Sequence, residues 1–242
     1  MKNFKIYAMG LAMAGALSFT SCADDYLDTA PTDAVSNVTI AQNMESLYLG
    51  LNGIHRQMIS QESGYQCMGG LGGMMYIMDI EADDITWITN TWMKAAYLGW
   101  QCNMNESNGY NTVFWRLYYQ WIMNANGLLE VLENTDVAAL SGSDKALYEQ
   151  IKGEALVFRA FSHFQAVQTY ADAYKAGGGN SQPGVPYRTV ANRNEGELAR
   201  STVEETYSLI NADLAEACSM LEGKKITELN HYSAKTAYAI RA

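Results

Sequence analysis

The carboxylates best placed for catalysis lie together in one short stretch. Glu81, Asp83 and Asp84 form an acidic cluster, and a pair of carboxylates is what glycoside hydrolysis requires. Neighbouring acids on a loop, however, are more often solvated or in contact with a cation. The sequence contains no Gly-x-Ser-x-Gly motif, no phosphate-binding loop and no dinucleotide fingerprint. We therefore predict that the protein is not an enzyme.

The histidines and cysteines are few, and their spacing does not predict a metal site. The three histidines are widely separated in the sequence: His55, His163 and His231. Apart from Cys22, the cysteines are odd in number and lack C-x-x-C spacing: Cys67, Cys102 and Cys218. This pattern indicates neither a zinc site nor a disulfide framework, although one disulfide is compatible with an oxidising compartment. We expect no metal and no cofactor.

Between residues 79 and 110, aromatic rings occur among amides in a stretch without regular periodicity. Sugars stack their C–H patches on aromatic faces, and their hydroxyls form hydrogen bonds with amides and acids. The stretch is therefore a candidate glycan-binding site with these members: Trp87, Asn90, Trp92, Trp100, Gln101 and Asn103. The alternative is that the rings only cover the helices, because aromatic side chains bury large areas. Trp115 and Trp121 lie at helical spacing and are expected in the core.

Cys22 stands where an apolar leader meets an acidic segment. Lys2 and Lys5 precede a charge-free apolar run over residues 6–19, which has the length of a signal-peptide core and is short for a membrane span. Small residues directly before Cys22 resemble a bacterial lipobox, in which the thiol is acylated and becomes the first mature residue. Several acyl chains on one cysteine would hold the protein durably at a membrane.

The charge balance argues against a nucleic-acid partner. The formal net charge is −10, and removal of residues 1–21 leaves 14 basic against 26 acidic residues, a net charge of −12. A nucleic-acid-binding protein normally carries a basic stripe. Anionic head groups would also repel such a chain, so the lipid must supply the membrane affinity. The run Ala-Asp-Asp after Cys22 resembles the export tag of lipoproteins that face the cell exterior.

Apolar side chains recur at helical spacing along most of the chain. Predicted helices cover residues 39–58, 110–133, 143–174 and 201–221, and a fifth begins after Ser233. No segment alternates with the period of two that a strand requires. We therefore predict an all-α fold, an irregular tetratricopeptide-like helical-repeat array with long loops.

Local signals mark the ends of these helices. Capping boxes are expected at Thr39 with Gln42 and at Ser201 with Glu204. The glycine-rich residues 60–76 are predicted to be a turn-rich connection. We divide the chain into a signal peptide (1–21), a lipidated acidic tether (22–38) and a helical domain (39–242). Because the last helix stops near its third turn, we expect this domain to be incomplete at its C-terminal end.

Several segments, in order, resemble the N-terminal half of SusD/RagB-type proteins. They are "DDYLDTAPTDAVS" after Cys22, "MESLYLGLNGIHRQM", "EADDI", "WRLYYQWIMNANGLLE", "GEALVFRAFSHFQAVQTYADAY", "GVPYRT" and "STVEETYSLINADLAEA". That family consists of surface glycan-binding lipoproteins that cap TonB-dependent, SusC-like transporters in the outer membrane. The resemblance implies an oligosaccharide or other nutrient as ligand, such a transporter as partner, and anchoring to the outer membrane by lipid. The insertion "KAGGGNSQ" departs from the family pattern.

Three polar residues within the apolar helices need partners. Glu154 and Arg159 are five residues apart and therefore poorly placed to pair with each other, so each is expected to contact a neighbouring helix. Asn126 lies in an apolar stripe and is expected to form hydrogen bonds with an adjacent loop or helix end. The main alternative to a glycan-binding lipoprotein is a helical-repeat adaptor of the cell envelope without a small ligand. A hydrolase whose catalytic part follows residue 242 is a third reading.

Overall fold

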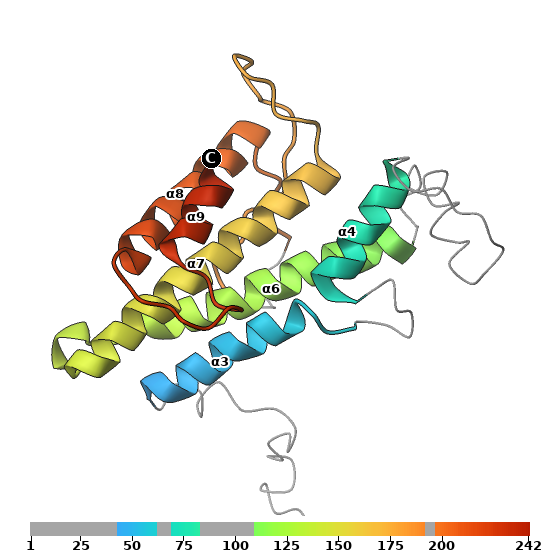
Figure 1. Ribbon diagram of the computed structural model, residues 1–242. Coiled ribbons are helices and arrows are strands. Elements are labelled where there is room, and N and C mark those ends of the chain that lie inside the picture. The colour runs from blue at the N-terminus through green and yellow to red at the C-terminus, as the bar shows by residue number, and fades with distance from the viewer. Residues whose placement is uncertain (1–42, 62–68, 83–108, 192–196) are drawn as a thin grey trace, which may run out of the picture. The chain divides into compact units, whose positions relative to one another are not determined.

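Helices form the described part of the protein, as the sequence predicts. The structure is a computed structural model that describes residues 43–61, 69–82, 109–191 and 197–242 (Figure 1). The helices are α3 (Met44–Gln57), α4 (Gly70–Glu81), α6 (Gly109–Glu133), α7 (Gly142–Tyr170), α8 (Val203–Leu221) and α9 (Ala234–Arg241). Over these ranges there is no strand, only two isolated bridges. The all-α prediction is confirmed, and the tetratricopeptide-like repeat stays a prediction.

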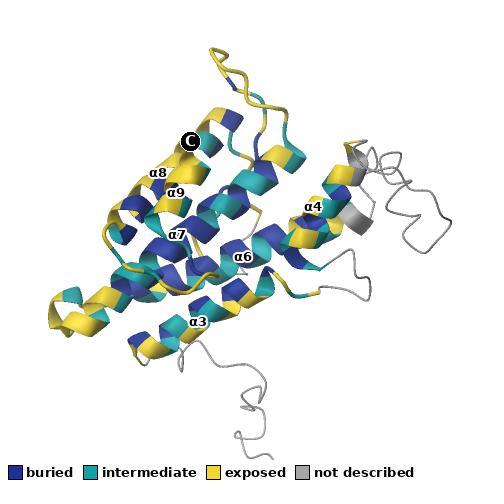
Figure 2. Cartoon of the chain, in the orientation of Figure 1, coloured by how far each residue is buried: buried dark blue, intermediate teal, exposed yellow. Residues whose placement is uncertain are grey.

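Helix α7 is the centre of the packing. It contacts α3, α6 and α8, while α9 packs on α8 (Figure 1). Figure 2 shows that α7 is buried over most of its length and exposed near its start. The stripe predicted for α6 is buried throughout: Phe114, Leu117, Tyr118, Trp121, Ile122, Ala125, Leu128, Leu129 and Leu132. Helix α7 is thus packed on several sides, as its sequence predicts from apolar residues over much of its circumference.

Two predicted helix starts are wrong. The N-cap of α3 is Asn43, whose side chain accepts a hydrogen bond from the Ser46 amide at 2.8 Å, whereas Thr39 lies outside the described residues. The capping box of α8 joins Thr202 and Glu205, one residue later than predicted. The sequence "STVEE" satisfies the box in either register, and the Ser201 amide instead donates to Val185 O.

The glycine-rich segment is also partly helical, which corrects its prediction as a connection. Helix α4 begins at Gly70, whose φ of +54° and closeness to Met58 O, 2.0 Å from where a Cβ would lie, allow only glycine. Each glycine in a helix costs about 1 kcal/mol. The fully buried side chains of Met74 and Ile77 together stabilise by about 3–6 kcal/mol and outweigh that cost.

Helices α7 and α8 approach closely at Gly153. A Cβ at this position would lie 2.6 Å from Leu221 Cγ, so only glycine fits without displacing Leu221. Two ion pairs cross the same interface. Arg159 donates to both carboxylate oxygens of Asp213 at 2.7 Å, and Lys152 Nζ lies 2.6 Å from Glu216. The first pair is nearly buried, whereas in the second Glu216 is exposed and Lys152 is partly exposed.

The contrast between these ion pairs gives a test of the fold. We expect Asp213→Asn to lower the free energy of unfolding by about 3 kcal/mol, because it leaves the buried Arg159 guanidinium without a countercharge. Glu216→Gln, on the same helix, should cost less than about 1 kcal/mol, as for other exposed pairs. Urea unfolding of both variants measures the difference. Equal losses in the free energy of unfolding would show that the Arg159–Asp213 pair contributes no more to stability than the Lys152–Glu216 pair.

Candidate functional site

The residues predicted to bind glycan lie outside the described part of the chain. Trp87, Asn90, Trp92, Trp100, Gln101 and Asn103 all fall within residues 83–108, and Cys22 falls within residues 1–42. Their roles stay predictions.

One aromatic surface is visible on the described helices. Trp115 was expected in the core, but 36% of it is exposed, which corrects that prediction. It lies one residue beyond Phe114, and hence about 100° around α6 from the buried stripe. Its ring packs beside Tyr119, with centroids 4.5 Å apart, and meets the edge of Tyr170 at 5.0 Å. We call these three rings the Trp115 platform. Trp121, in contrast, is fully buried, as predicted.

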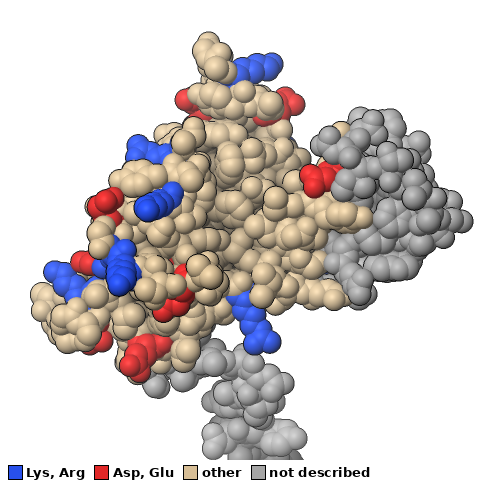
Figure 3. Space-filling view, in the orientation of Figure 1, with Lys and Arg blue, Asp and Glu red and all other residues tan. Residues whose placement is uncertain are grey.

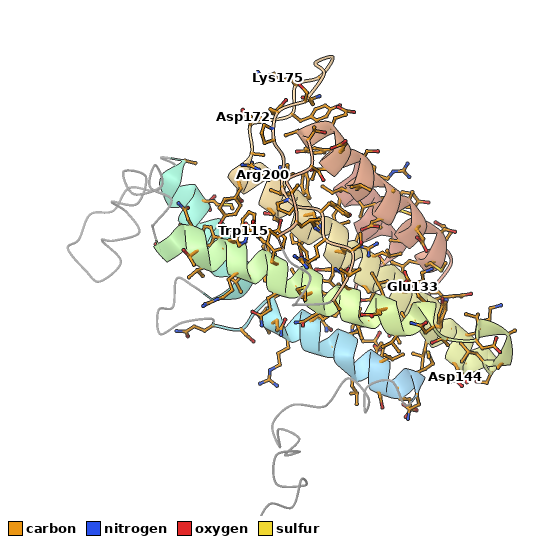
Figure 4. All side chains as sticks on the ribbon, turned by 180° about the vertical axis from the view of Figure 1, so that it is seen from behind. Trp115, Glu133, Asp144, Asp172, Lys175 and Arg200 are labelled. Atoms are coloured by element: carbon orange, nitrogen blue, oxygen red, sulfur yellow. The ribbon has the colours of Figure 1, made fainter. Side chains whose placement is uncertain are left out.

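Hydrogen bonds hold the Trp115 platform in place. Tyr119 Oη donates to Pro186 O at 2.8 Å, and burial raises the pKa of this phenol. Arg200 donates to three carbonyl oxygens, those of Tyr170, Pro183 and Gly184, and so joins the end of α7 to the following segment. Figure 4 shows Trp115 towards the same end of the helices as Arg200 and Asp172, whereas Glu133 and Asp144 lie towards the other end. A fixed, partly exposed indole of this kind can stack on an apolar sugar face.

The loop between α7 and α8 projects from that end of the helices (Figure 1). Its conformation depends on Asn180, which has a φ of 41° and a buried side chain. The Asn180 amide accepts from the Lys175 amide at 2.8 Å and donates to Lys175 O and to Glu204. Asparagine tolerates this left-handed conformation better than most residues. The inserted segment "KAGGGNSQ" therefore has a defined conformation that the hydrogen bonds of Asn180 stabilise.

A buried polar network ties the segment after this loop to the helices. The Asn126 amide donates to Arg188 O and Val190 O, which confirms the predicted contact with a loop. Arg159 reaches Asp213 on α8, which confirms the predicted partner on a neighbouring helix. Burial by itself lowers the pKa of Arg159, but the hydrogen bonds and charge of Asp213 raise it overall.

His163 belongs to the same network as a neutral imidazole. Its Nδ1 lies 2.8 Å from Arg159 O and its Nε2 accepts from the Arg188 amide at 3.1 Å, so the proton is on Nδ1. Its ring stacks on Tyr187 with centroids 3.8 Å apart. Burial lowers the pKa of His163 to about 3. Both ring nitrogens of His163 are thus hydrogen-bonded within the protein, and the imidazole has a structural role.

The other two histidines meet at one carboxylate. His55 Nε2 lies 2.8 Å from Glu154 Oε2, and His231 Nδ1 lies 3.0 Å from both Glu154 oxygens. Burial by itself raises the pKa of Glu154, but hydrogen bonds, that from His55 foremost, lower it overall, so the carboxylate is ionised. The predicted contact of Glu154 with a neighbouring helix is confirmed. No local pattern predicts this cluster, because His55 and His231 lie 99 and 77 residues from Glu154 in the sequence.

Charge and hydropathy add two observations. On the face shown in Figure 3, Lys and Arg side chains are spread among Asp and Glu rather than gathered into a basic stripe. Among the helices that the structure describes, none combines the length and the apolar character needed to cross a membrane.

Solved structures with the same fold include SusD-type proteins. A SusD-like carbohydrate-binding protein from Bacteroides vulgatus is 19% identical, with a TM-score of 0.68 over 82% of this chain and 40% of its own. A SusD superfamily protein from Bacteroides thetaiotaomicron is 24% identical, with a TM-score of 0.62 over 82% and 41%. A laminarin-binding SusD-like protein is 19% identical, with a TM-score of 0.60 over 82% and 39%. These similarities establish the fold class.

The chain belongs to the SusD-like family. Residues 25–242 match the model of this family, which is described as starch-binding and associating with the outer membrane. The chain spans about two fifths of the length of the solved structures it matches. No curated protein matches it. The resemblance drawn from the sequence segments is therefore confirmed at the level of the family.

The depressed pKa of His163 predicts a pH dependence of stability. Between its ordinary value of 6.5 and about 3, the unfolded chain binds a proton at this site and the folded chain does not. Stability should therefore fall as the pH is lowered through this window, by up to about 1.4 kcal/mol per pH unit from this group. Urea unfolding at pH 6.5 and 5.0 should show a smaller drop for His163→Gln than for the wild type. An identical drop would contradict the assignment.

Proposed function

We propose that the protein is a cell-surface lipoprotein that binds a glycan and passes it to a TonB-dependent, SusC-like transporter. The observation that carries this proposal is the family match over residues 25–242. The description of that family, starch-binding and associated with the outer membrane, supports both a glycan ligand and the location. A structure with the same fold is of a laminarin-binding protein, which supports a polysaccharide ligand. The mechanism would be binding and transfer, without covalent chemistry.

The anchor in this proposal is Cys22. Lipid at this residue, followed by the acidic run, would hold the protein on the outer face of the outer membrane. The described helices would serve as a scaffold and as the surface that meets the transporter. Their packing around α7 supports a rigid role, since the long helices share one core.

Two sets of aromatic residues are candidates for contact with sugar. The first is the predicted set, of which Trp87, Trp92 and Trp100 are the rings. The second is the Trp115 platform, whose partly exposed indole is fixed by two tyrosines. An adaptor without a small ligand is the alternative function, and a hydrolase is the third. Binding and activity assays on polysaccharides separate the three.

Affinity gels containing starch or laminarin test ligand binding. We expect the full chain to be retarded in at least one gel, and Trp87→Ala with Trp92→Ala and Trp100→Ala to reduce retardation. Each stacking ring contributes about 0.5–1.5 kcal/mol, or roughly twofold to tenfold in affinity. Trp115→Ala tests the platform in the same way. Tyr238→Ala, at an exposed tyrosine of α9, is the control and should change nothing.

The outcomes of these gels are distinct. If the Trp87/Trp92/Trp100 triple variant loses retardation and the Trp115 variant keeps it, the sugar binds at the predicted residues. If the Trp115 variant loses retardation and the triple variant keeps it, the sugar binds at the Trp115 platform. Absence of retardation in either gel, for a protein shown to be folded by circular dichroism, contradicts the glycan proposal for these polysaccharides and favours the adaptor. Release of reducing sugar from either polysaccharide would instead favour the hydrolase.

Metabolic labelling tests the anchor. In a bacterial host supplied with alkyne-palmitate, the wild type should take up label, and Cys22→Ala should not, because the thiol is the acylated atom. Cys218→Ala is the matched control, since Cys218 is buried in α8 and should leave labelling unchanged. Globomycin should cause the unprocessed precursor to accumulate. Label on the Cys22→Ala variant would remove the anchor from the proposal.

A further inference from the structure

Three ligand-type side chains converge in the interior at His55, Glu154 and His231. One ligating atom from each lies within 4.8 Å of the others. The side chains are 5%, 0% and 2% exposed, so the cluster is enclosed. The residues come from α3, from α7 and from the segment directly before α9. Three elements that are distant in the sequence thus each contribute one group to a single point.

We propose that His55, Glu154 and His231 bind a divalent transition-metal ion, with Zn²⁺ as the best fit. Two imidazole nitrogens and one carboxylate are a donor set that zinc accepts in proteins. Calcium and magnesium are poor candidates, because they prefer sites made of oxygen alone. No thiolate is present in the cluster, which disfavours softer ions such as Cu(I).

Between the imidazoles and the carboxylate, the geometry requires only small movements to admit the ion, and the ligating atoms of the two histidines lie within 4.8 Å of each other. Zinc lies about 2.0–2.2 Å from nitrogen and oxygen ligands, which places tetrahedral ligand atoms about 3.3 Å apart. The present separations of 2.8 and 3.0 Å between imidazole and carboxylate atoms are shorter by about half an ångström or less. Since His231 Nδ1 is 3.0 Å from both Glu154 oxygens, the carboxylate can bind the ion through either oxygen or through both, and in the second case the two oxygens lie closer together than tetrahedral ligands do.

The surroundings orient these ligands as an outer shell does in known metal sites. The Gln150 side chain donates to Glu154 Oε1 at 2.9 Å, and the Tyr232 amide donates to Oε2 at 3.0 Å. Tyr48 Oη lies 3.4 Å from His231 Nε2, so it can accept a hydrogen bond from the N–H that this nitrogen carries when Nδ1 binds the metal. Carboxylate oxygens have enough lone pairs to keep these bonds and bind the ion.

The rings themselves are held by packing. His55 meets Phe158 and Tyr232 edge-on, with centroids 4.6 and 5.1 Å apart. His231 stacks on Tyr48 at 5.2 Å. The residues between α8 and His231 are non-helical and mostly exposed. Metal binding would fasten the segment before α9 to α3 and α7.

A purely hydrogen-bonded cluster is the competing explanation, and suitable variants separate the two. Asparagine places its amide nitrogen near the position of an imidazole Nδ1, and glutamine does so for Nε2. His231→Asn and His55→Gln therefore keep the donors to Glu154 while removing both nitrogen ligands. If the cluster only forms hydrogen bonds, these variants should behave like the wild type towards metal.

Titration of the full chain with Zn²⁺ after removal of metal by chelator tests the proposal. The protein, prepared without a histidine tag, should bind one equivalent and show a higher melting temperature with Zn²⁺. The double variant His55→Gln/His231→Asn should bind about a hundredfold more weakly, and Tyr48→Phe about tenfold more weakly. Co²⁺ should give visible d–d absorption without the near-ultraviolet band of a cobalt–thiolate bond.

A control variant addresses the thiols, which also bind zinc. Cys67→Ser with Cys102→Ser and Cys218→Ser should bind Zn²⁺ as tightly as the wild type. The proposal is overturned if the wild type binds no equivalent of Zn²⁺. It is equally overturned if the double histidine variant retains the wild-type affinity, or if the cysteine variant loses it.

Discussion

The burial of α7 on several sides is the constraint on which the rest of the structure depends. A helix enclosed in this way must pair its buried charged and imidazole side chains, because an unpaired buried charge or amide costs several kcal/mol. Three such side chains lie on its inner turns: Glu154, Arg159 and His163. Each contacts a different neighbour. Glu154 reaches α3 and the segment before α9, Arg159 reaches α8, and His163 reaches the segment after the projecting loop.

These contacts explain why the long irregular segments follow defined paths. The described residues between α7 and α8, 171–191 and 197–202, contain no helix or strand. Asn126 on α6 and His163 on α7 bind carbonyl and amide groups of this segment, and Arg200 binds a carbonyl group from within it. The projecting loop is similarly set by Asn180. Side-chain hydrogen bonds thus add to the few backbone bonds of this segment, such as that from the Gly184 amide to Ser201 O. A scaffold of this kind can present loops in fixed positions, which is what a glycan-binding surface requires.

Local patterns in the sequence predict most of this fold. The stripe of α6 and the need of Arg159 and Asn126 for partners could be predicted because each follows from spacing and polarity alone. Helix α4 could not, since the local cost of glycine is outweighed by burial of Met74 and Ile77 in the tertiary structure. The meeting of His55 with His231 has no local signal at all, because it depends on how helices pack. The predicted glycan-binding residues lie outside the described chain and stay a hypothesis from the sequence.

The glycine at the crossing of α7 and α8 has a wider consequence. A Cβ at Gly153 would lie 2.6 Å from Leu221 Cγ, so the two helices can approach this closely here only because residue 153 is glycine. Six residues further along α7, the Arg159 guanidinium binds Asp213 with both bonds at 2.7 Å, at the short end of hydrogen-bond lengths. The absence of a side chain at Gly153 therefore allows α7 and α8 to pack closely at this crossing. A methyl group at this position would have to displace the Leu221 side chain, and if α8 moved away as a whole, the Arg159–Asp213 bonds would lengthen with it.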